Sequence, residues 1–409
     1  MKDTANWMML SLVICLANGH GVVAMSSQKT PPGVVIDHSP ASSGLYIGSP
    51  SLAVLPNGDY VASHDFFGPQ SNEFKEAISV VFRSTDQGQT WKKASEIHGA
   101  FWSSLFVLQG KLYLVGTNRH HGDIVIRRSE DRGSTWTSPA DSTCGLLRDN
   151  DEYHCAPMPV IEHRGRVWRG FEQRNPPAAW GINYRAGVLS APVGADLLVA
   201  DNWIASTFLP SNRQWNGGDM GAWLEGNVVV TSGGDLLDVL RVQTQSPHEK
   251  AAIVRISPDG TEASFDPNSG FVDFPGGAKK FAIRYDSRTG LYWSIATIVP
   301  EKHRAKNPGG IRNTLALTCS PDLKEWRVRC VLLYHPDTAR HGFQYVDWHF
   351  EGHALIAVCR TAYDDGQGGA HNNHDANYLT FHRWPAFRDL SMADSVSGWQ
   401  EDTDDTTLN

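Results

Sequence analysis

Histidine, tyrosine and arginine side chains gather in short polar phrases between the hydrophobic stretches of this sequence. His120 and His121 are adjacent, and Tyr153 directly precedes His154. Neutral histidine and tyrosine exchange protons with a substrate, and arginine holds a carboxylate through two parallel hydrogen bonds. Together these residue types indicate chemistry beside an acidic group.

β-Elimination next to a sugar carboxylate needs a base for the acidic C5 proton, an acid for the leaving oxygen and cations that neutralise the carboxylate. We predict the catalytic residues to be His64, His121, His154 and Tyr184. We predict the substrate-binding residues to be Arg169, Arg174, Gln344 and Arg360. Arg169 and Arg174 lie an odd number of residues apart, so one strand would not turn both toward the same carboxylate.

A glycoside hydrolase is the open alternative. Such an enzyme uses two carboxyl groups about 5–10 Å apart. Asp65, Glu172 and Asp347 are candidates, but none stands in a phrase that marks it as one of a pair. The phrases therefore favour a lyase over a hydrolase, and a non-catalytic glycan-binding protein is a third alternative.

No cofactor is required by this chemistry, but His371, His374 and Cys359 offer a ligand set for zinc or another divalent metal. Their spacing matches no standard zinc motif. The alternative is two surface histidines and a buried thiol.

The N-terminus has the pattern of a secretory signal. Lys2 is followed by the apolar stretch 7–17 and by the small residues Val22-Val23-Ala24. The stretch is shorter than the ~20 residues of a membrane-spanning helix. We expect a signal peptide at 1–24, one catalytic domain at 25–395 and an acidic tail at 396–409, in a secreted or periplasmic protein without a membrane anchor after cleavage.

Charge and cysteine content limit the partners further. Against 36 Lys and Arg stand 44 Asp and Glu, giving a formal net charge of -8. This balance excludes a broad nucleic-acid surface, so an acidic ligand must be held by a local basic cluster. After the signal five cysteines remain, and this odd count argues against a disulfide scaffold. Pairing of Cys319 with Cys330 across a hairpin stays open.

The phrase S-x-D-x-G-x-T-W occurs twice, at 84–91 and 129–136, and a degenerate copy begins at Ser320. Each copy follows a strand-like run, which predicts a hairpin turn whose Asp accepts backbone N–H groups. This phrase resembles the Asp-box of sialidase-like β-propellers, where it is structural. Strand pairs joined by short turns recur six times without a long amphipathic helix, so the sequence predicts an all-β, single-domain propeller with six visible blades.

A true sialidase would carry an Arg-Ile-Pro phrase in its first blade. Here the corresponding residues are Gly48-Ser49-Pro50, so the arginine that would bind the sialic acid carboxylate is absent. Other phrases resemble secreted enzymes that cleave L-rhamnose from an α-1,4 linkage to D-glucuronate, related to propeller ulvan lyases. The phrases are 48–65, 153–157 and 359–383. This resemblance covers essentially all of residues 34–390 and implies a lyase or an α-L-rhamnosidase that acts on an acidic glycan containing rhamnose and glucuronate.

The resemblance also implies seven blades, and we follow it over the count of six, with the strand at 34–37 as part of a seventh unit. It places a functional histidine at His64. We therefore expect the His64 ring to point into the mouth of the central channel, and replacement of His64 by Ala to abolish turnover.

For a lyase, reduction of the glucuronate carboxyl to an alcohol is expected to abolish rhamnose release from a rhamnose–glucuronate disaccharide. The carboxylate provides both recognition and the acidity of C5. Chromatography of the products measures this release, and an equal rate from the reduced disaccharide would favour a hydrolase that recognises rhamnose alone.

Overall fold

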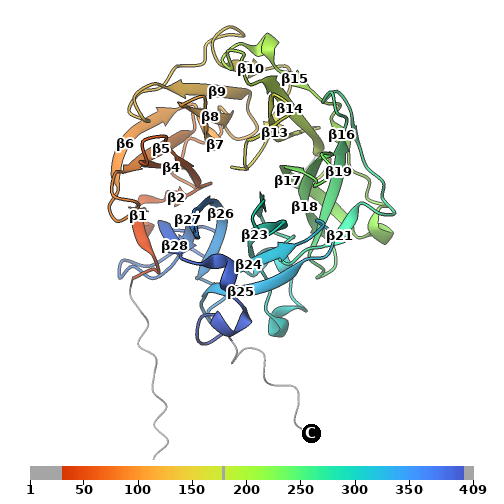
Figure 1. The fold of residues 1–409 in the computed structure, drawn as a ribbon. Helices are drawn as coiled ribbons and strands as arrows, with labels where there is room; N and C mark the ends of the chain where they lie inside the picture. The colour runs from red at the N-terminus through yellow and green to blue at the C-terminus, as the bar shows by residue number, and fades with distance from the viewer. Residues whose placement is uncertain (1–29, 177–179, 400–409) are drawn as a thin grey trace, which may run out of the picture.

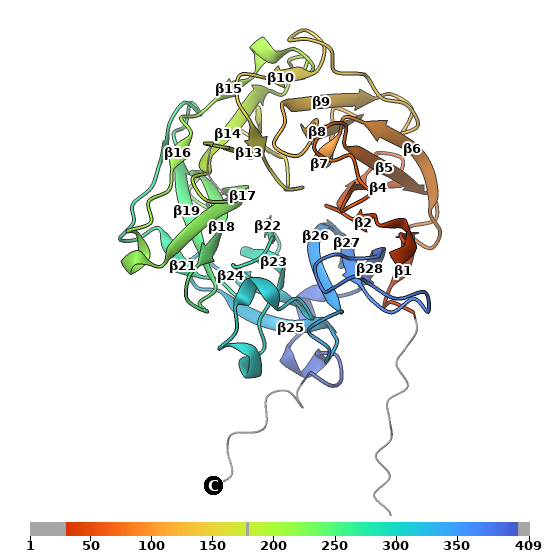
Figure 2. The ribbon, with the colours of Figure 1, turned by 180° about the vertical axis from the view of Figure 1, so that it is seen from behind.

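Six antiparallel sheets surround a central axis in the computed structural model, which describes residues 30–176 and 180–399 (Figures 1 and 2). Each sheet is one blade of a β-propeller. In the described residues helical structure is limited to 3-10 turns: η1 (Ala41–Ser43), η2 (Ala200–Asn202), η3 (Asn216–Gly218), η4 (Glu301–His303), η5 (Pro308–Gly310), η6 (Phe387–Asp389) and η7 (Met392–Asp394). No described helix is long and apolar enough to span a membrane.

The first three blades follow one another along the chain. Blade 1 contains β2 (Tyr46–Ile47), β3 (Ser51–Val54), β4 (Tyr60–Phe67), β5 (Ile78–Ser84) and β6 (Lys92–His98). Blade 2 contains β7 (Phe101–Leu108), β8 (Lys111–Thr117), β9 (Ile124–Ser129) and β10 (Leu146–Arg148). Blade 3 contains β11 (Tyr153–His154), β12 (Ile161–His163), β13 (Arg166–Gln173), β14 (Arg185–Pro192), β15 (Ile204–Ala205) and β16 (Leu209–Pro210).

The last three blades complete the ring. Blade 4 contains β17 (Met220–Val230), β18 (Leu236–Thr244), β19 (Lys250–Ile256), β20 (Ala263–Ser264) and β21 (Phe271–Asp273). Blade 5 contains β22 (Ala282–Asp286), β23 (Leu291–Thr297), β24 (Thr314–Ser320) and β25 (Arg327–Tyr334). Blade 6 contains β26 (Gly342–Glu351), β27 (Ala354–Ala362), β28 (Tyr378–Trp384) and, from the N-terminal part of the chain, β1 (Val34–His38).

Strand β1 closes the ring as the outermost strand of blade 6. Val34 lies opposite Phe381, and His38 lies opposite Tyr378. Because β1 pairs with a strand from the other end of the chain, it forms no blade of its own. The expectation of seven blades is therefore wrong, and the number of sheets equals the six strand pairs counted in the sequence. The fourth of those pairs, 221–224 with 227–231, is not the predicted hairpin, because both runs belong to the one bulged strand β17 and its end.

The repeated phrases form the expected hairpin turns. In the first copy, between β5 and β6, Asp86 accepts the Thr90 backbone N–H at 2.9 Å, and Gly88 adopts a φ of 87°. In the second, Asp131 accepts the Thr135 N–H at 2.8 Å. The structure adds one copy that the sequence analysis missed, the turn at 257–261 in blade 4, where Asp259 contacts the Thr261 N–H.

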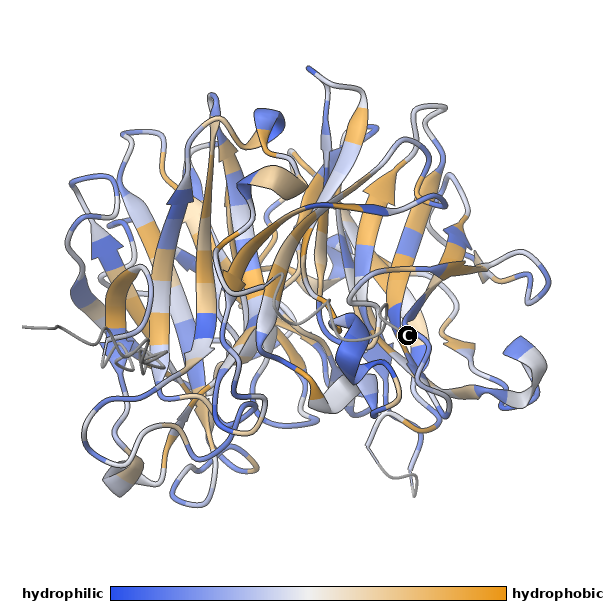
Figure 3. Cartoon of the chain, turned by 90° about the horizontal axis from the view of Figure 1, so that it is seen from below, coloured by the Kyte–Doolittle hydropathy of each residue, from blue (hydrophilic) through white to orange (hydrophobic). Residues whose placement is uncertain are grey.

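Hydrophobic residues are frequent along the strands, and hydrophilic residues predominate in the loops (Figure 3). The core consists of apolar clusters that join neighbouring blades. Trp168 and Trp223 are buried in the cluster between blades 3 and 4, and Trp293 and Trp348 in the cluster between blades 5 and 6. A cluster of mainly aliphatic residues joins blades 1 and 2. Val396 and Trp399, assigned to the tail from sequence, pack against blade 5. The signal segment 1–24 and residues 400–409 lie outside the described part of the chain.

The five cysteines in the described residues are free. Cys319 lies opposite Arg327, whereas Cys330 lies opposite Leu317, so the two thiols are out of register on adjacent strands.

Side-chain hydrogen bonds to the backbone of the adjacent blade connect all six blades at the channel. Five buried N–H groups donate across blade boundaries: Leu52 to Asp347 (2.9 Å), Trp102 to Asp65 (2.6 Å), Met158 to Ser104 (3.0 Å), Gly226 to Glu172 (2.9 Å) and Ile283 to Asn227 (2.8 Å). At the remaining boundary the Thr297 hydroxyl donates to the Phe343 carbonyl at 2.6 Å. These contacts satisfy backbone groups that no strand partner reaches.

Replacement of Asn227 by Ala is expected to destabilise the protein by about 1–3 kcal/mol, because the buried Ile283 N–H loses its acceptor. Urea unfolding measures this loss. Asn72→Ala, in an exposed loop, is the control and should change stability by less than about 0.5 kcal/mol. Equal stability of the two variants would show that this contact between blades contributes nothing.

Candidate functional site

A cavity of about 300 Å³ lies where the six blades converge on one face. It is lined by Gly48, Ser49, Asp65, Phe67, Glu73, Phe101, Trp102, His120, His154, Cys155, Ala156, Trp180, Glu225, Arg241, Arg312, Tyr345, Arg360 and His374. Every blade, or a loop next to it, contributes at least one residue. A ligand here would contact residues that are far apart in the sequence.

Three cavity side chains stand on bulges of innermost strands. Trp102 on β7, Glu225 on β17 and Tyr345 on β26 have φ angles of 50°, 61° and 55°, and the strand register shifts at each position. Non-glycine residues rarely adopt positive φ, and such strain collects at functional sites. A bulge re-aims a side chain, and these three place theirs in the cavity.

Three guanidinium groups share the cavity. Arg241 donates to both oxygens of Glu225, at 3.1 and 3.2 Å. Arg312 donates to the Gln344 amide oxygen. Arg360 Nε donates to the His374 carbonyl at 3.1 Å.

Two of these cations lack a carboxylate partner. In the described residues neither Arg312 nor Arg360 forms an ion pair. Burial lowers the pKa of Arg312 to about 10, so its guanidinium remains charged near neutral pH. Buried cations that form no direct ion pair favour the binding of an anion such as a carboxylate.

Asp65 lies in the cavity wall with both carboxyl oxygens engaged. Its Oδ1 accepts the Ser49 N–H at 2.7 Å, and its Oδ2 accepts the Trp102 N–H at 2.6 Å. Burial raises the pKa of Asp65 to about 6. This carboxyl group therefore holds a proton well above the usual range and can act as a general acid.

Glu225 and Tyr345 meet at the same cation. Both interact with the Arg241 guanidinium. Burial and the nearby Glu225 raise the pKa of the Tyr345 phenol. The phenol thus keeps its proton near neutral pH, and Glu225 is the nearby group that can accept that proton.

Histidines and aromatic rings form the opposite wall. His154 Nδ1 lies 2.7 Å from Glu172, and its ring meets Trp102 and Trp180 at centroid distances of 4.5 and 4.8 Å. Burial and His154 lower the pKa of His120 to about 4, so this ring is neutral near pH 7.

Of the four predicted catalytic residues, only His154 is among the cavity-lining residues. His121 and Tyr184 hydrogen-bond to each other directly behind this wall, 6.4 and 5.0 Å from the His154 ring centroid. Burial and His120 lower the pKa of His121 to about 2. Burial raises the pKa of Tyr184, so both groups are neutral.

The expected placement of His64 is wrong. Its ring is buried between blades 1 and 6, where Nδ1 contacts the Asp65 carbonyl at 2.9 Å and Nε2 contacts Asp37 at 2.8 Å. The ring stacks on Phe82. Asp37 belongs to β1, so closure of the ring by β1 turns this histidine into an internal contact rather than a channel residue.

Of the four predicted substrate-binding residues, two lie at the cavity or beside it and two do not. Arg360 lines the cavity, and Gln344 holds Arg312 beside it. Arg169 is fully buried and donates to the Gly170 and Ala156 carbonyls, so it does not reach the cavity. Arg174 pairs with Glu152 and is not among the lining residues.

The predicted metal ligands do not converge. The Cys359 thiol is buried and faces the Gln344 and Arg360 carbonyls, while the His371 side chain is 61% exposed and stacks on Tyr46. His374 contacts Asp375 and Arg360 instead. Among the residues that the structure describes, no group of three His, Cys, Asp or Glu side chains is arranged to hold a metal ion.

Sequence reasoning missed several residues of the cavity, including Glu225, Arg241, Arg312 and Tyr345 and the indoles Trp102 and Trp180. A signal was present for two of them. Glu225 and Arg241 interrupt hydrophobic strands, and a charged residue in a buried strand needs a partner.

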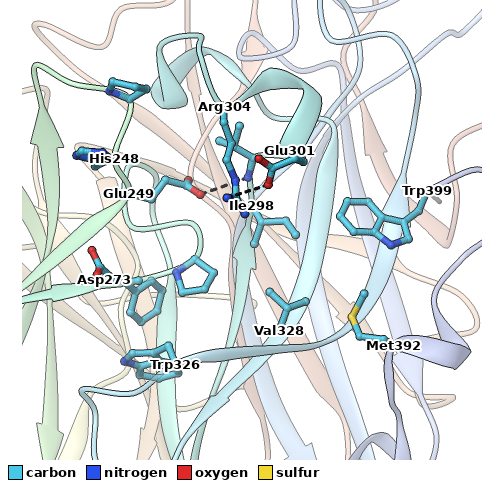
Figure 4. A pocket seen from close by; sticks show the side chains of 14 residues that line it. His248, Glu249, Asp273, Ile298, Glu301, Arg304, Trp326, Val328, Met392 and Trp399 are labelled. Carbon is cyan, nitrogen blue, oxygen red and sulfur yellow. Dashed lines mark hydrogen bonds and ion pairs between the residues drawn. The ribbon is translucent and has the colours of Figure 1, made fainter. Parts of the chain in front are cut away.

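A second cavity of about 580 Å³ lies between blades 4 and 5 and the C-terminal segment, with Trp326 and Trp399 on opposite sides (Figure 4). Its charged groups are already paired. Glu301 contacts Arg304 at 2.8 Å, and Glu249 contacts Lys279 at 2.9 Å. It contains none of the predicted site residues.

No family model matches the sequence, and no curated protein sequence matches it. Solved structures do resemble the fold. An α-L-arabinanase from Penicillium chrysogenum is 15% identical, with a TM-score of 0.54 over 88% of this chain and 98% of that one. The Hadza microbial sialidase Hz136 is 14% identical, with a TM-score of 0.61 over 88% and 69%.

The α-L-arabinofuranosidase Arb93A from Fusarium graminearum is 12% identical, with a TM-score of 0.54 over 87% of this chain and 98% of that one. These distant likenesses establish the β-propeller fold that this chain shares with carbohydrate-processing enzymes.

Replacement of Arg360 by Lys is expected to weaken the binding of D-glucuronate about tenfold, because lysine retains the charge but loses the planar two-point contact. Calorimetry measures the dissociation constant. Arg174→Lys is the matched control and should stay within twofold of the wild type. A larger effect at Arg174 would place the carboxylate outside this cavity.

Proposed function

We propose that the protein is an enzyme that hydrolyses the glycosidic bond between a uronate and its neighbouring sugar in an acidic glycan. The observation that carries this proposal is the convergence of Arg241, Arg312 and Arg360 in one cavity with Asp65 and the Glu225–Tyr345 couple. The three cations bind the carboxylate, and the other groups perform the chemistry.

The reaction has two steps. Tyr345 attacks the anomeric carbon while Glu225 takes the phenolic proton, and Asp65 gives its proton to the departing sugar oxygen. Water then attacks the same carbon, giving its proton to Asp65, and the Tyr345 oxygen leaves and regains its proton from Glu225. Arg241 holds Glu225 and Tyr345 in place throughout.

β-Elimination at the L-rhamnose-α-1,4-D-glucuronate linkage is the second candidate. It is favoured by the neutral ring of His120, and by His154, in the same cavity as the arginines. A neutral histidine can take the C5 proton of a uronate whose carboxylate is neutralised by arginine. The product would be a 4,5-unsaturated uronate, and an ulvan-type glycan is a related substrate.

Under either chemistry the glycan contains rhamnose and glucuronate, and the protein acts outside the cytoplasm. Neither reaction needs a metal or an organic cofactor, because the cations and the proton-transfer groups all come from the chain. The signal pattern at 1–24 supports export.

Incubation with gum arabic, a rhamnose–glucuronate disaccharide and ulvan separates the two candidates. Hydrolysis is expected to release reducing sugars without new ultraviolet absorbance, whereas elimination creates an absorbing double bond. Absorbance that grows in step with sugar release would overturn hydrolysis and support the lyase. Neither product from any of the three glycans would contradict both.

The pH profile gives an independent test. Asp65 must be protonated to act as an acid, so the hydrolytic rate is expected to fall as pH rises through about 6. Asp65→Asn should reduce kcat by about 10²–10⁴-fold. Since the lyase base is a histidine that is neutral above pH 4, a rate that holds from pH 6 to 8 would instead indicate elimination.

A further inference from the structure

Few large hydrophobic side chains are exposed in the part of the chain that the structure describes. In the described residues the exposed ones are Val35, Phe74, Trp180, Tyr285 and Met392. Two of them, Phe74 at 66% exposure and Trp180 at 42%, lie beside the cavity that contains the arginines. Exposed aromatic rings at the rim of a binding site mark a contact surface for a ligand.

Phe74, His120, Trp102 and Trp180 form one continuous aromatic wall. The Phe74 and His120 ring centroids are 4.6 Å apart, and Trp180 lies 5.7 Å from His120 and 5.8 Å from Trp102. Phe74 and Trp180 belong to blades 1 and 3, and Trp102 and His120 to blade 2 between them. The wall therefore extends from the buried Trp102 outward to two solvent-exposed rings.

The loop that carries Phe74 is held in place by its neighbour. Glu73 is buried and accepts hydrogen bonds from the Gly68 N–H at 2.9 Å and the Ser71 hydroxyl at 2.8 Å. Its backbone carbonyl accepts the His120 N–H at 2.8 Å. This anchoring fixes the largely exposed Phe74 ring at the surface, next to His120.

The two sides of the cavity thus differ in character. Arg241, Arg312 and Arg360 make one side cationic, whereas the aromatic wall offers flat apolar faces. A ligand that complements both sides carries a carboxylate at one end and a ring with an apolar C–H face next to it. A uronate linked to a neutral sugar has this composition.

We propose that Phe74 and Trp180 form a subsite that binds the neutral sugar across the scissile bond from the uronate. This inference rests on the proposed function and deepens it, because it makes a disaccharide the smallest good substrate. The neutral ring stacks on the aromatic faces, while the carboxylate lies among the guanidinium groups.

Steady-state kinetics with a rhamnose–glucuronate disaccharide tests the subsite. Phe74→Ala and Trp180→Ala should each raise KM about tenfold with kcat nearly unchanged, because the stacking is made equally in the ground and transition states. The inhibition constant of free D-glucuronate should stay within twofold, since that probe does not reach the subsite. Tyr285→Ala removes an aromatic ring of similar exposure, 43%, from blade 5 and should leave every constant unchanged.

Two results would overturn the subsite alone: an unchanged KM in both variants, or a rise in the glucuronate inhibition constant that parallels the rise in KM. Absence of turnover of the disaccharide by the wild-type protein would overturn the subsite and the proposed function together.

Discussion

Each innermost strand of a propeller has one edge without a strand partner, and its buried N–H groups still need acceptors. Here side chains of the adjacent blade meet this need, as Asp347 does for Leu52 and Asn227 does for Ile283. Because every such bond crosses a blade boundary, it also fixes how neighbouring blades are oriented. The position of the cavity depends on this ring of hydrogen bonds, since its side chains come from all six blades.

The same hydrogen bonds between blades also hold the strained backbone of the site in place. Asp65 accepts the N–H of Trp102, and Glu172 accepts the N–H of Gly226, so two of the three positive-φ bulges are held by a neighbouring blade. The cost of those conformations, about 1–3 kcal/mol each, is offset by packing elsewhere. The resulting site contains a cluster of buried guanidinium groups, although the net charge of the protein is -8. The attraction for an acidic ligand is thus local rather than global.

Local features were predictable from the sequence, and convergent ones were not. The Asp-box turns depend on contiguous residues such as Asp86 and Thr90, so they revealed the propeller, and the six repeats were counted from strand pairs that are adjacent in the sequence. Arg360 was found because it stands in one of the distinctive phrases, at 359–383. Arg312 was missed because its role arises only when blades 5 and 6 meet. His64 was misplaced because its environment depends on β1, which reaches it only when the two ends of the chain pair.

The proposed function requires that the three arginines bind the carboxylate of an acidic sugar. A crystal structure of the protein soaked with D-glucuronate would show whether they do. We expect electron density for the sugar in the 300 Å³ cavity, with its carboxylate within hydrogen-bonding distance of Arg241, Arg312 and Arg360 and its ring toward Asp65. An empty cavity at saturating ligand, or a carboxylate bound away from these guanidinium groups, would contradict it.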